Sequence, residues 1–422
     1  MIKNYKFSNF HSYLNETVVD LTVSKRALHS YFDYECTDGS KISKVMCAFG
    51  ANGSGKSNLL KPLAFVSWFL TESFRSLKED EEIPFFPHFA KENEPTSIEV
   101  DFVVPCPSSS ELGVEEDSEE LIDFEYRYAL ILTENYVVKE ELKIRSENTG
   151  LFKRVFLREL KNGKYVIKKG NDYVRAPISL FDGCPDNCSM VSYLARLKDD
   201  DSHRKIPYII LANVYFALNS SNLTVSGRQH EIDLDLATEY FRQDPEQFGK
   251  VKKLLKNYDL GIKDINIVSK TVINDETGKK EERFIPFFTH ENQKTEYEIP
   301  IWLESSGTQS AYFMLAQIIQ KLKTGGVAIL DEFDNDLHPL LTLEILELFK
   351  CEQHNVCNAQ LIFTTHTPQV LDVLRKQHCY LVEKHDSESE VWRIDEVEGI
   401  KERDNLYSKY INGLLGGVPE FD

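Results

Sequence analysis

A glycine-rich segment at residues 50–57 has the residue types that bind phosphate groups. It reads GANGSGKS, the pattern G-x-x-x-x-G-K-S, and a short apolar stretch, 45–49, precedes it. Glycines at this spacing let successive backbone N–H groups face one anion, and a helix that starts at the lysine adds partial positive charge. The segment therefore predicts a nucleoside triphosphate site rather than an unliganded glycine-rich turn.

The polar side chains of this segment have distinct expected roles. Lys56 would reach the β- and γ-phosphates of ATP, and the hydroxyl of Ser57 would bind Mg²⁺. The residues predicted to bind the nucleotide are Gly50, Asn52, Gly53, Ser54, Gly55, Lys56, Ser57 and Asn58.

Two adjacent carboxylates follow a second apolar stretch, 326–330. A buried strand that ends in Asp331 and Glu332 is the Walker B arrangement of nucleotide hydrolases. We expect Asp331 to hold Mg²⁺ through water and Glu332 to polarise the attacking water. A further apolar stretch, 360–365, ends in His366. If these strands are parallel neighbours, His366 lies at the same sheet edge, where it would contact the γ-phosphate and serve catalysis.

A turn of small residues, Ser305-Ser306-Gly307-Thr308, precedes a helical pattern. A helix N-terminus of this kind can bind an anion, and Ser305, Ser306 and Gly307 are further candidates for contact with the nucleotide. Taken alone, the same residues are an ordinary helix cap. Their place between the phosphate-binding segment and the acidic pair favours the nucleotide role.

The composition limits the functions that this chain could have. Its 422 residues are 41% hydrophobic, which indicates a folded protein, and no apolar run approaches the roughly 20 residues that cross a bilayer. A formal charge of −19 argues against a nonspecific coat on nucleic acid but leaves room for a local basic patch. The N-terminus lacks a signal-peptide pattern and the eight cysteines form no disulfide framework, so we expect a cytoplasmic protein.

The remaining pattern predicts an α/β protein in three parts: an N-terminal lobe over 1–187, a helical insertion over 188–260 and a C-terminal lobe over 261–422. The first part combines a P-loop strand and helix with a meandering antiparallel sheet, and a turn is expected at 105–110. Expected strands are 2–10, 16–23, 97–104, 121–133, 136–145, 152–160, 165–167 and several within 263–301; expected helices begin at 56, 190, 207, 248, 309 and 340.

The ordered set of phosphate loop, S-S-G-T, D-E-F-D-N-D-L-H-P and T-T-H-T resembles the heads of ABC-type ATPases. Within them the chain is similar to bacterial AAA-family ATPases related to RecF, the SMC proteins and the overcoming-lysogenization-defect nucleases. The most similar subgroup occurs in anti-phage abortive-infection and restriction-linked operons. The likeness extends to N-F-H-S-Y at the start and Y-S-K-Y-I-N-G-L-L-G-G-V-P at the end.

This resemblance implies an ABC-type head that is incomplete alone, with ATP held between the phosphate loop of one copy and Ser305 and Gly307 of another. The implied partners are a second copy, or a higher homo-oligomer, and an effector protein from the same operon. Three residues or segments depart from the family pattern. His11 stands where the opening strand usually carries arginine, Ser306 replaces a glycine, and no glutamine-containing loop is evident before Glu99.

Two functions compete at this point. The preferred one is a sensor or regulatory ATPase of an anti-phage defence system that controls a separate effector such as a nuclease. The alternative is a DNA-repair or chromosome-maintenance ATPase acting on DNA ends, so nucleic acid stays open as a partner. Such proteins normally carry long coiled coils, and no sustained heptads occur between residues 60 and 300. A membrane-transporter motor is a third, disfavoured class.

Overall fold

The computed structural model describes residues 1–107, 121–146, 150–170, 173, 177–196, 220–221, 229–258, 261–273, 280–292, 295–334 and 337–418. The helix expected from residue 207 lies outside these residues, as does the second half of the turn expected at 105–110.

A six-stranded, mainly parallel sheet forms the centre of the protein. Its strand order is β12-β16-β17-β6-β18-β19, and only the edge strand β19 runs antiparallel to its neighbour. The bounds are β12 Ser220–Ser221, β16 Val327–Leu330, β17 Gln360–Thr364, β6 Val45–Gly50, β18 Cys379–His385 and β19 Glu388–Arg393. Strands β16, β17 and β6 are buried along their whole length, as expected of parallel strands covered on both faces.

Alternate residues of strand β6 pack into two different cores. Met46 and Ala48 join a cluster with helix α1 (Lys56–Ser76), whereas Cys47 and Phe49 join one with helices α7 (Ser306–Thr324) and α8 (Pro339–Lys350). This two-residue alternation fixes the register of the strand and therefore the place of the loop that follows it.

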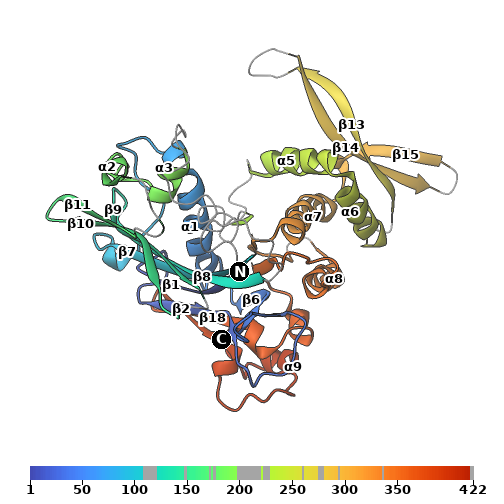
Figure 1. The fold of residues 1–422 in the computed structure, drawn as a ribbon. Coiled ribbons are helices and arrows are strands. Elements are labelled where there is room, and N and C mark those ends of the chain that lie inside the picture. Colours follow the sequence, from blue (N-terminus) through green and yellow to red (C-terminus); the bar gives the residue numbers. More distant parts are fainter. Residues whose placement is uncertain are drawn as a thin grey trace.

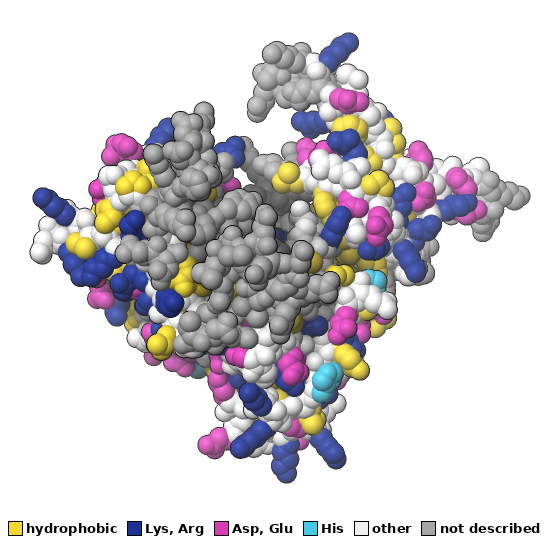
Figure 2. Space-filling model, in the orientation of Figure 1, with side chains coloured by type: hydrophobic (Ala, Val, Ile, Leu, Met, Phe, Trp, Pro, Cys, Tyr) yellow, Lys and Arg dark blue, Asp and Glu magenta, His cyan; other side chains and the backbone are white. Residues whose placement is uncertain are grey.

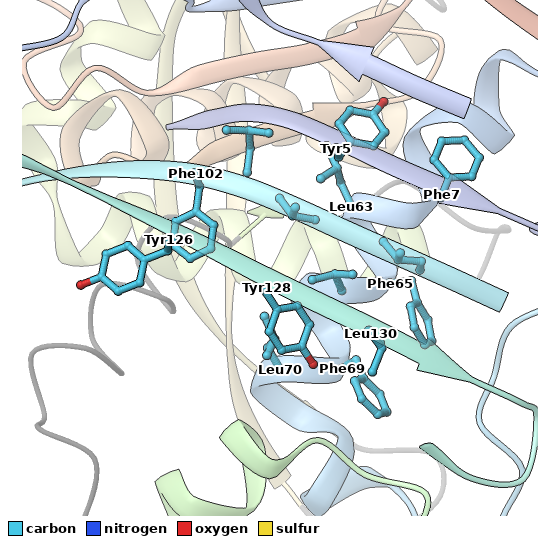
Figure 3. Close-up of a cluster of buried hydrophobic side chains, with 14 of the residues drawn as sticks. Tyr5, Phe7, Leu63, Phe65, Phe69, Leu70, Phe102, Tyr126, Tyr128 and Leu130 are labelled. Atoms are coloured by element: carbon cyan, nitrogen blue, oxygen red, sulfur yellow. The ribbon is translucent and has the colours of Figure 1, made fainter. Parts of the chain in front are cut away.

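A seven-stranded antiparallel sheet covers the other side of α1. Its order is β11-β10-β9-β8-β7-β1-β2, and Figure 3 shows aromatic side chains of β1, β7 and β8 gathered with Leu63, Phe65, Phe69 and Leu70 of α1. The bounds are β1 Ile2–Ser8, β2 Thr17–Asp20, β7 Thr96–Pro107, β8 Leu121–Leu132, β9 Val137–Ser146, β10 Lys153–Lys161 and β11 Lys164–Lys169. These strands match the predicted meander closely.

The expected turn after Val104 is wrong at its start, because β7 continues through Pro105 to Pro107. Prolines are tolerated where one side of a strand is unpaired. Strand β1 pairs with β7 only as far as Phe102, and the last link is the Val103 N–H to the Met1 carbonyl. Beyond this point β7 pairs with β8 alone, so a missing proline N–H leaves no ladder partner unsatisfied.

A separate three-stranded sheet projects from the body (Figure 1). Strand β13 (Ile262–Ile273) and β14 (Lys280–Asn292) form a long hairpin, and β15 (Thr295–Pro300) leads to α7. Helices α5 (Gln229–Gln243) and α6 (Pro245–Tyr258) pack against both this sheet and α7, whereas α3 (Met190–Arg196) packs on α1. Helices from the predicted insertion thus lie in two places, and its boundaries stay a prediction.

The remaining elements are short. They are α2 Ile178–Phe181, α9 Leu406–Ile411, a small sheet of β3 Thr22–Val23, β5 Lys41–Ser43 and β4 Asp33–Glu35, and several 3₁₀ turns. Among the described residues, no helix has the length and apolarity required to cross a membrane. The architecture confirms the predicted α/β class, with a P-loop sheet beside an antiparallel one.

Candidate functional site

The phosphate loop leaves the carboxyl end of β6 and turns directly into α1. Two of its glycines are required by close approach: a Cβ on Gly50 would collide with the Val382 carbonyl oxygen, and one on Gly55 would collide with the hydroxyl of Ser389. Gly55 also has a left-handed φ of 111°, which disfavours any side chain. The backbone of this loop can take its shape only with glycine at these positions.

Lys56 is buried and lies inside the loop that it follows. Its Nζ donates to the carbonyl oxygens of Gly50 at 2.9 Å and Ala51 at 3.0 Å. Burial lowers the pKa of Lys56, and the nearby carboxylates of Asp331 and Glu332 partly oppose that effect. The ammonium group is therefore held by neutral acceptors, which it can exchange for phosphate oxygens.

The loop also has a polar atom without a partner. The hydroxyl of Ser54 is buried, and it makes no hydrogen bond in the described part of the chain. A buried donor that lacks an acceptor costs about 1–3 kcal/mol. A bound phosphate would supply both this acceptor and the counter-charge for Lys56, so the residues present fit a nucleotide.

Two serines that the sequence did not single out support the loop from outside. Ser389, on β19, donates from Oγ to the Ser54 carbonyl at 2.6 Å, and its Oγ lies 2.8 Å from that of Ser12. The Ser389 N–H donates to the Ser12 carbonyl. The predicted nucleotide ligand Asn58 donates its side-chain N–H to Ser12 Oγ at 2.9 Å, so its amide is engaged in this support.

The two acidic residues lie where the sequence predicted, at the carboxyl end of β16. Thr364 Oγ1 donates to Asp331 Oδ1 at 2.6 Å and accepts from the Glu332 N–H at 2.7 Å. Glu332 has a φ of 48°, a left-handed conformation that is strained for a residue with a side chain. Strand β17 thus fixes the backbone that carries both carboxylates, while the Glu332 side chain is exposed.

Because β16, β17 and β6 are adjacent and parallel, their carboxyl ends meet at one edge of the sheet. This edge carries the phosphate loop, Asp331, Glu332 and the exposed His366. The structure therefore brings together the predicted phosphate, metal and catalytic residues of one chain.

Asp334 positions His366 and was missed at the sequence level. Its carboxylate accepts from the His366 N–H at 3.0 Å and from Thr367 Oγ1 at 2.5 Å. Both contacts join the loop after β16 to the loop after β17. In the sequence, Asp334 stands out only as an acidic residue three positions after Asp331. Asp334 determines where the histidine backbone lies.

Replacing Asp334 with alanine should lower kcat for ATP by about tenfold. Each lost hydrogen bond to a carboxylate is worth about 1.5–3 kcal/mol, and we expect about half of one such bond to appear as a higher activation free energy, because His366 is held less firmly. ATP affinity should change little. Steady-state hydrolysis with separately measured ATP binding checks both values. The Asp334→Asn variant, which keeps one acceptor oxygen, should lie between alanine and the parent; a parental kcat in Asp334→Ala would refute the positioning role.

The small-residue turn is exposed and stands apart from this edge. Ser305 caps α7, and its Oγ accepts from the Thr308 N–H at 3.1 Å. Ser305 and Ser306 are exposed, and Gly307 is half-buried. Within the described residues, no hydrogen bond or ion pair joins this turn to the phosphate loop. Ser305 and Ser306 are thus accessible to a group from another molecule.

His11 does not replace the arginine of the family pattern as a cation. Its ring lies against Phe10 and Phe86. Burial, with the positive charge of Lys61 as a smaller cause, lowers the pKa of His11 to about 4. At neutral pH the imidazole is uncharged and adds no positive charge to the loop.

Comparison with known proteins identifies the family. A family model described as "AAA domain, putative AbiEii toxin, Type IV TA system" matches residues 46–372, which run from β6 past His366. The chain belongs to this family. No curated protein matches the sequence of this AAA domain. The protein is accordingly an ATPase of the AAA type, in agreement with its phosphate loop and acidic pair.

Several solved structures are similar to this AAA domain at low identity. An SMC head domain from Thermotoga maritima is 14% identical, with a TM-score of 0.41, and covers 93% of this chain and 98% of its own. An Smc head domain with a coiled coil and joint from Pyrococcus yayanosii is 10% identical, with a TM-score of 0.42 and coverages of 93% and 96%. ATP-bound RecF, a recombination mediator protein, is 14% identical, with a TM-score of 0.31 and coverages of 93% and 97%.

Proposed function

We propose that this protein is an ABC-type ATPase that binds and hydrolyses ATP between two copies of the chain. The observation that carries the proposal is an asymmetry in the site. The phosphate loop, the acidic pair and His366 share one sheet edge, whereas the capped, exposed turn at Ser305 and Ser306 has no described link to that edge. A second copy would supply the missing helix N-terminus. The free energy of ATP binding would then stabilise the dimer.

Each residue of the edge has a role in this proposal. Lys56 exchanges its carbonyl partners for phosphate oxygens. Ser57 and Asp331 would hold Mg²⁺, which would supply positive charge beside the phosphates. Glu332 accepts the proton of the attacking water, and His366 contacts the γ-phosphate. From the other copy, Ser305, Ser306 and Gly307 contribute hydroxyl and N–H donors.

Mixing two inactive variants tests whether the site is shared. Lys56→Ala removes the phosphate-loop cation, and Ser306→Arg blocks the turn. In a mixed dimer one site carries both defects and the other carries none, because each site takes its loop and its turn from different chains. ATP hydrolysis should therefore reappear when the variants are combined, approaching half the parental rate per dimer formed.

The control is each variant alone at the same total concentration, which should stay inactive. A different affinity tag on each variant, with capture on one tag and detection of the other, confirms that mixed dimers form. Mixed dimers without hydrolysis would show that loop and turn act in one chain, and the shared site would be abandoned.

We further propose that the ATPase is a cytoplasmic sensor or regulatory subunit of an anti-phage defence system and controls an effector such as a nuclease. The family description, which refers to a toxin of a type IV toxin–antitoxin system, supports a role of this class. Expression with the neighbouring gene of its operon should protect cells from phage. Protection that persists with Lys56→Ala would contradict control by ATP.

A basic face favours the second candidate, a DNA-linked ATPase. Lys139, Lys143 and Arg154 all lie within 3.3 Å of the Glu141 carboxylate, so three cations surround one acid in a chain of charge −19. Figure 2 shows Lys and Arg side chains gathered on the side of the molecule where Figure 1 places β10 and β11. Strong stimulation of ATP hydrolysis by double-stranded DNA ends would favour this role; indifference to DNA would favour the protein effector.

A further inference from the structure

A cavity lies at the amino ends of the parallel strands, opposite the edge that carries the phosphate loop. It is lined by residues 29–32, by Lys350 at the end of α8, by residues 371–376 before β18 and by residues 401–406 before and at the start of α9. Strands β17 and β18 begin after two of these segments and run toward the ATP edge. We call this cavity the amino-edge pocket.

The amino-edge pocket has the size of a small-molecule site and an excess of positive charge. Its volume is about 530 Å³, within the usual range of about 300–1,000 Å³ for ligand pockets. Five cationic side chains line it against three carboxylates. The cations are Lys350, Arg375, Lys376, Lys401 and Arg403, and the carboxylates are Asp372, Glu402 and Asp404.

Ion pairs neutralise only part of this charge. Lys376 contacts Glu402 at 3.0 Å, and Asp404 is paired with Lys409, which lies outside the lining, at 3.1 Å. Lys350 contacts Glu347, also outside the lining, at 3.0 Å.

The other cations of the pocket are unpaired. Within the described ranges, Arg375, Lys401 and Arg403 form no ion pair, and Asp372 is the one lining carboxylate without a partner. Three cations outside any ion pair and one such acid thus line the pocket, in a protein whose acidic residues exceed its basic ones by 19, although the charge of Lys401 also acts on Asp404. Like charges held close without a counter-ion repel one another, so the pocket gains from an anionic ligand.

We propose that the amino-edge pocket binds a small phosphorylated molecule carrying at least two phosphate groups. Guanidinium groups match phosphate oxygens in a two-pronged geometry, and here they come from two separate segments, at Arg375 and Arg403. The exposed ring of Tyr31, which contacts His29 edge-on, adds an aromatic surface for a planar group. A volume of about 530 Å³ suits a compact ligand better than an extended acidic peptide.

Binding can be measured without interference from the ATP site. The full chain carrying Lys56→Ala is titrated with inorganic tripolyphosphate in a calorimeter, and the measurement is repeated after adding Arg375→Gln and Arg403→Gln. The proposal predicts binding with one ligand per chain, and at least a tenfold loss of affinity in the pocket variant, because two charged hydrogen-bond donors are removed. Unchanged thermal unfolding shows that the variant is folded.

A matched pair of substitutions controls for charge. Lys253→Gln and Lys256→Gln remove two exposed cations from α6, which does not line the pocket, and should alter the affinity less than twofold. Equal losses in both pairs would mean nonspecific attraction and would overturn the proposal. So would tripolyphosphate binding that the pocket substitutions leave unchanged, no binding at all, or tighter binding of a poly-glutamate peptide.

Discussion

Replacing Glu332 with glutamine is expected to slow ATP hydrolysis by about 10²- to 10⁴-fold, the usual contribution of a general base. Glutamine has the same shape but cannot accept the proton of the attacking water. The backbone should not change, because its N–H is fixed by Thr364 and its φ of 48° is set by the turn after β16. ATP should still bind, since the phosphate loop is untouched.

The variant should therefore accumulate an ATP-bound dimer, which light scattering detects as a doubling of mass on addition of ATP. Glu344→Gln is a suitable control, because Glu344 is an exposed acid on α8 and its replacement should leave hydrolysis unchanged. Hydrolysis by Glu332→Gln at the parental rate would rule out Glu332 as the base.

Replacing Lys56 with alanine should weaken ATP binding at least about 100-fold. The ammonium group is expected to contact two phosphates, and each charged hydrogen bond contributes about 1.5–3 kcal/mol, so the summed loss corresponds to two or more powers of ten in Kd. In the absence of ATP the variant should be nearly as stable as the parent. The substitution removes hydrogen bonds to two backbone carbonyls, but it also removes a charge that burial disfavours, so the two effects oppose each other.

Calorimetric titration with a non-hydrolysable ATP analogue, together with thermal unfolding in its presence and absence, measures both effects. The parent should be stabilised by the analogue and Lys56→Ala should not. Lys384→Ala, at an exposed position of β18, is the control and should behave as the parent. Equal stabilisation of Lys56→Ala and the parent would show that the nucleotide binds elsewhere.

Local motifs were sufficient to predict where most of the candidate site residues lie in the fold. The phosphate loop, the acidic pair and His366 each follow an apolar strand, and parallel pairing of those strands brings their ends to one edge. The antiparallel meander could be predicted equally well, because apolar and polar residues alternate along each of its strands. Helix α5 was not singled out, although Leu234, Ala237 and Phe241 recur at helical spacing and pack in one core.

The supporting contacts could not be predicted in the same way. Ser389 reaches Ser54 and Ser12 across 335 and 377 residues of chain, and serine has no pattern that distinguishes such a role from an exposed turn. Asp334 acts through a backbone N–H, which any residue at position 366 would offer. The amino-edge pocket gathers cations from three distant segments, each of which is unremarkable alone.

The position of β6 has a consequence for how the protein is made. The phosphate loop is complete in sequence by residue 57, but β6 is flanked by β17 and β18, and the loop rests on Ser389. A growing polypeptide on the ribosome lacks these partners until about 390 residues have been synthesised. Such distant pairings also form slowly, because long loops must close first. Newly made chains should therefore be unable to bind ATP at this loop until β18 and β19 have been synthesised and paired.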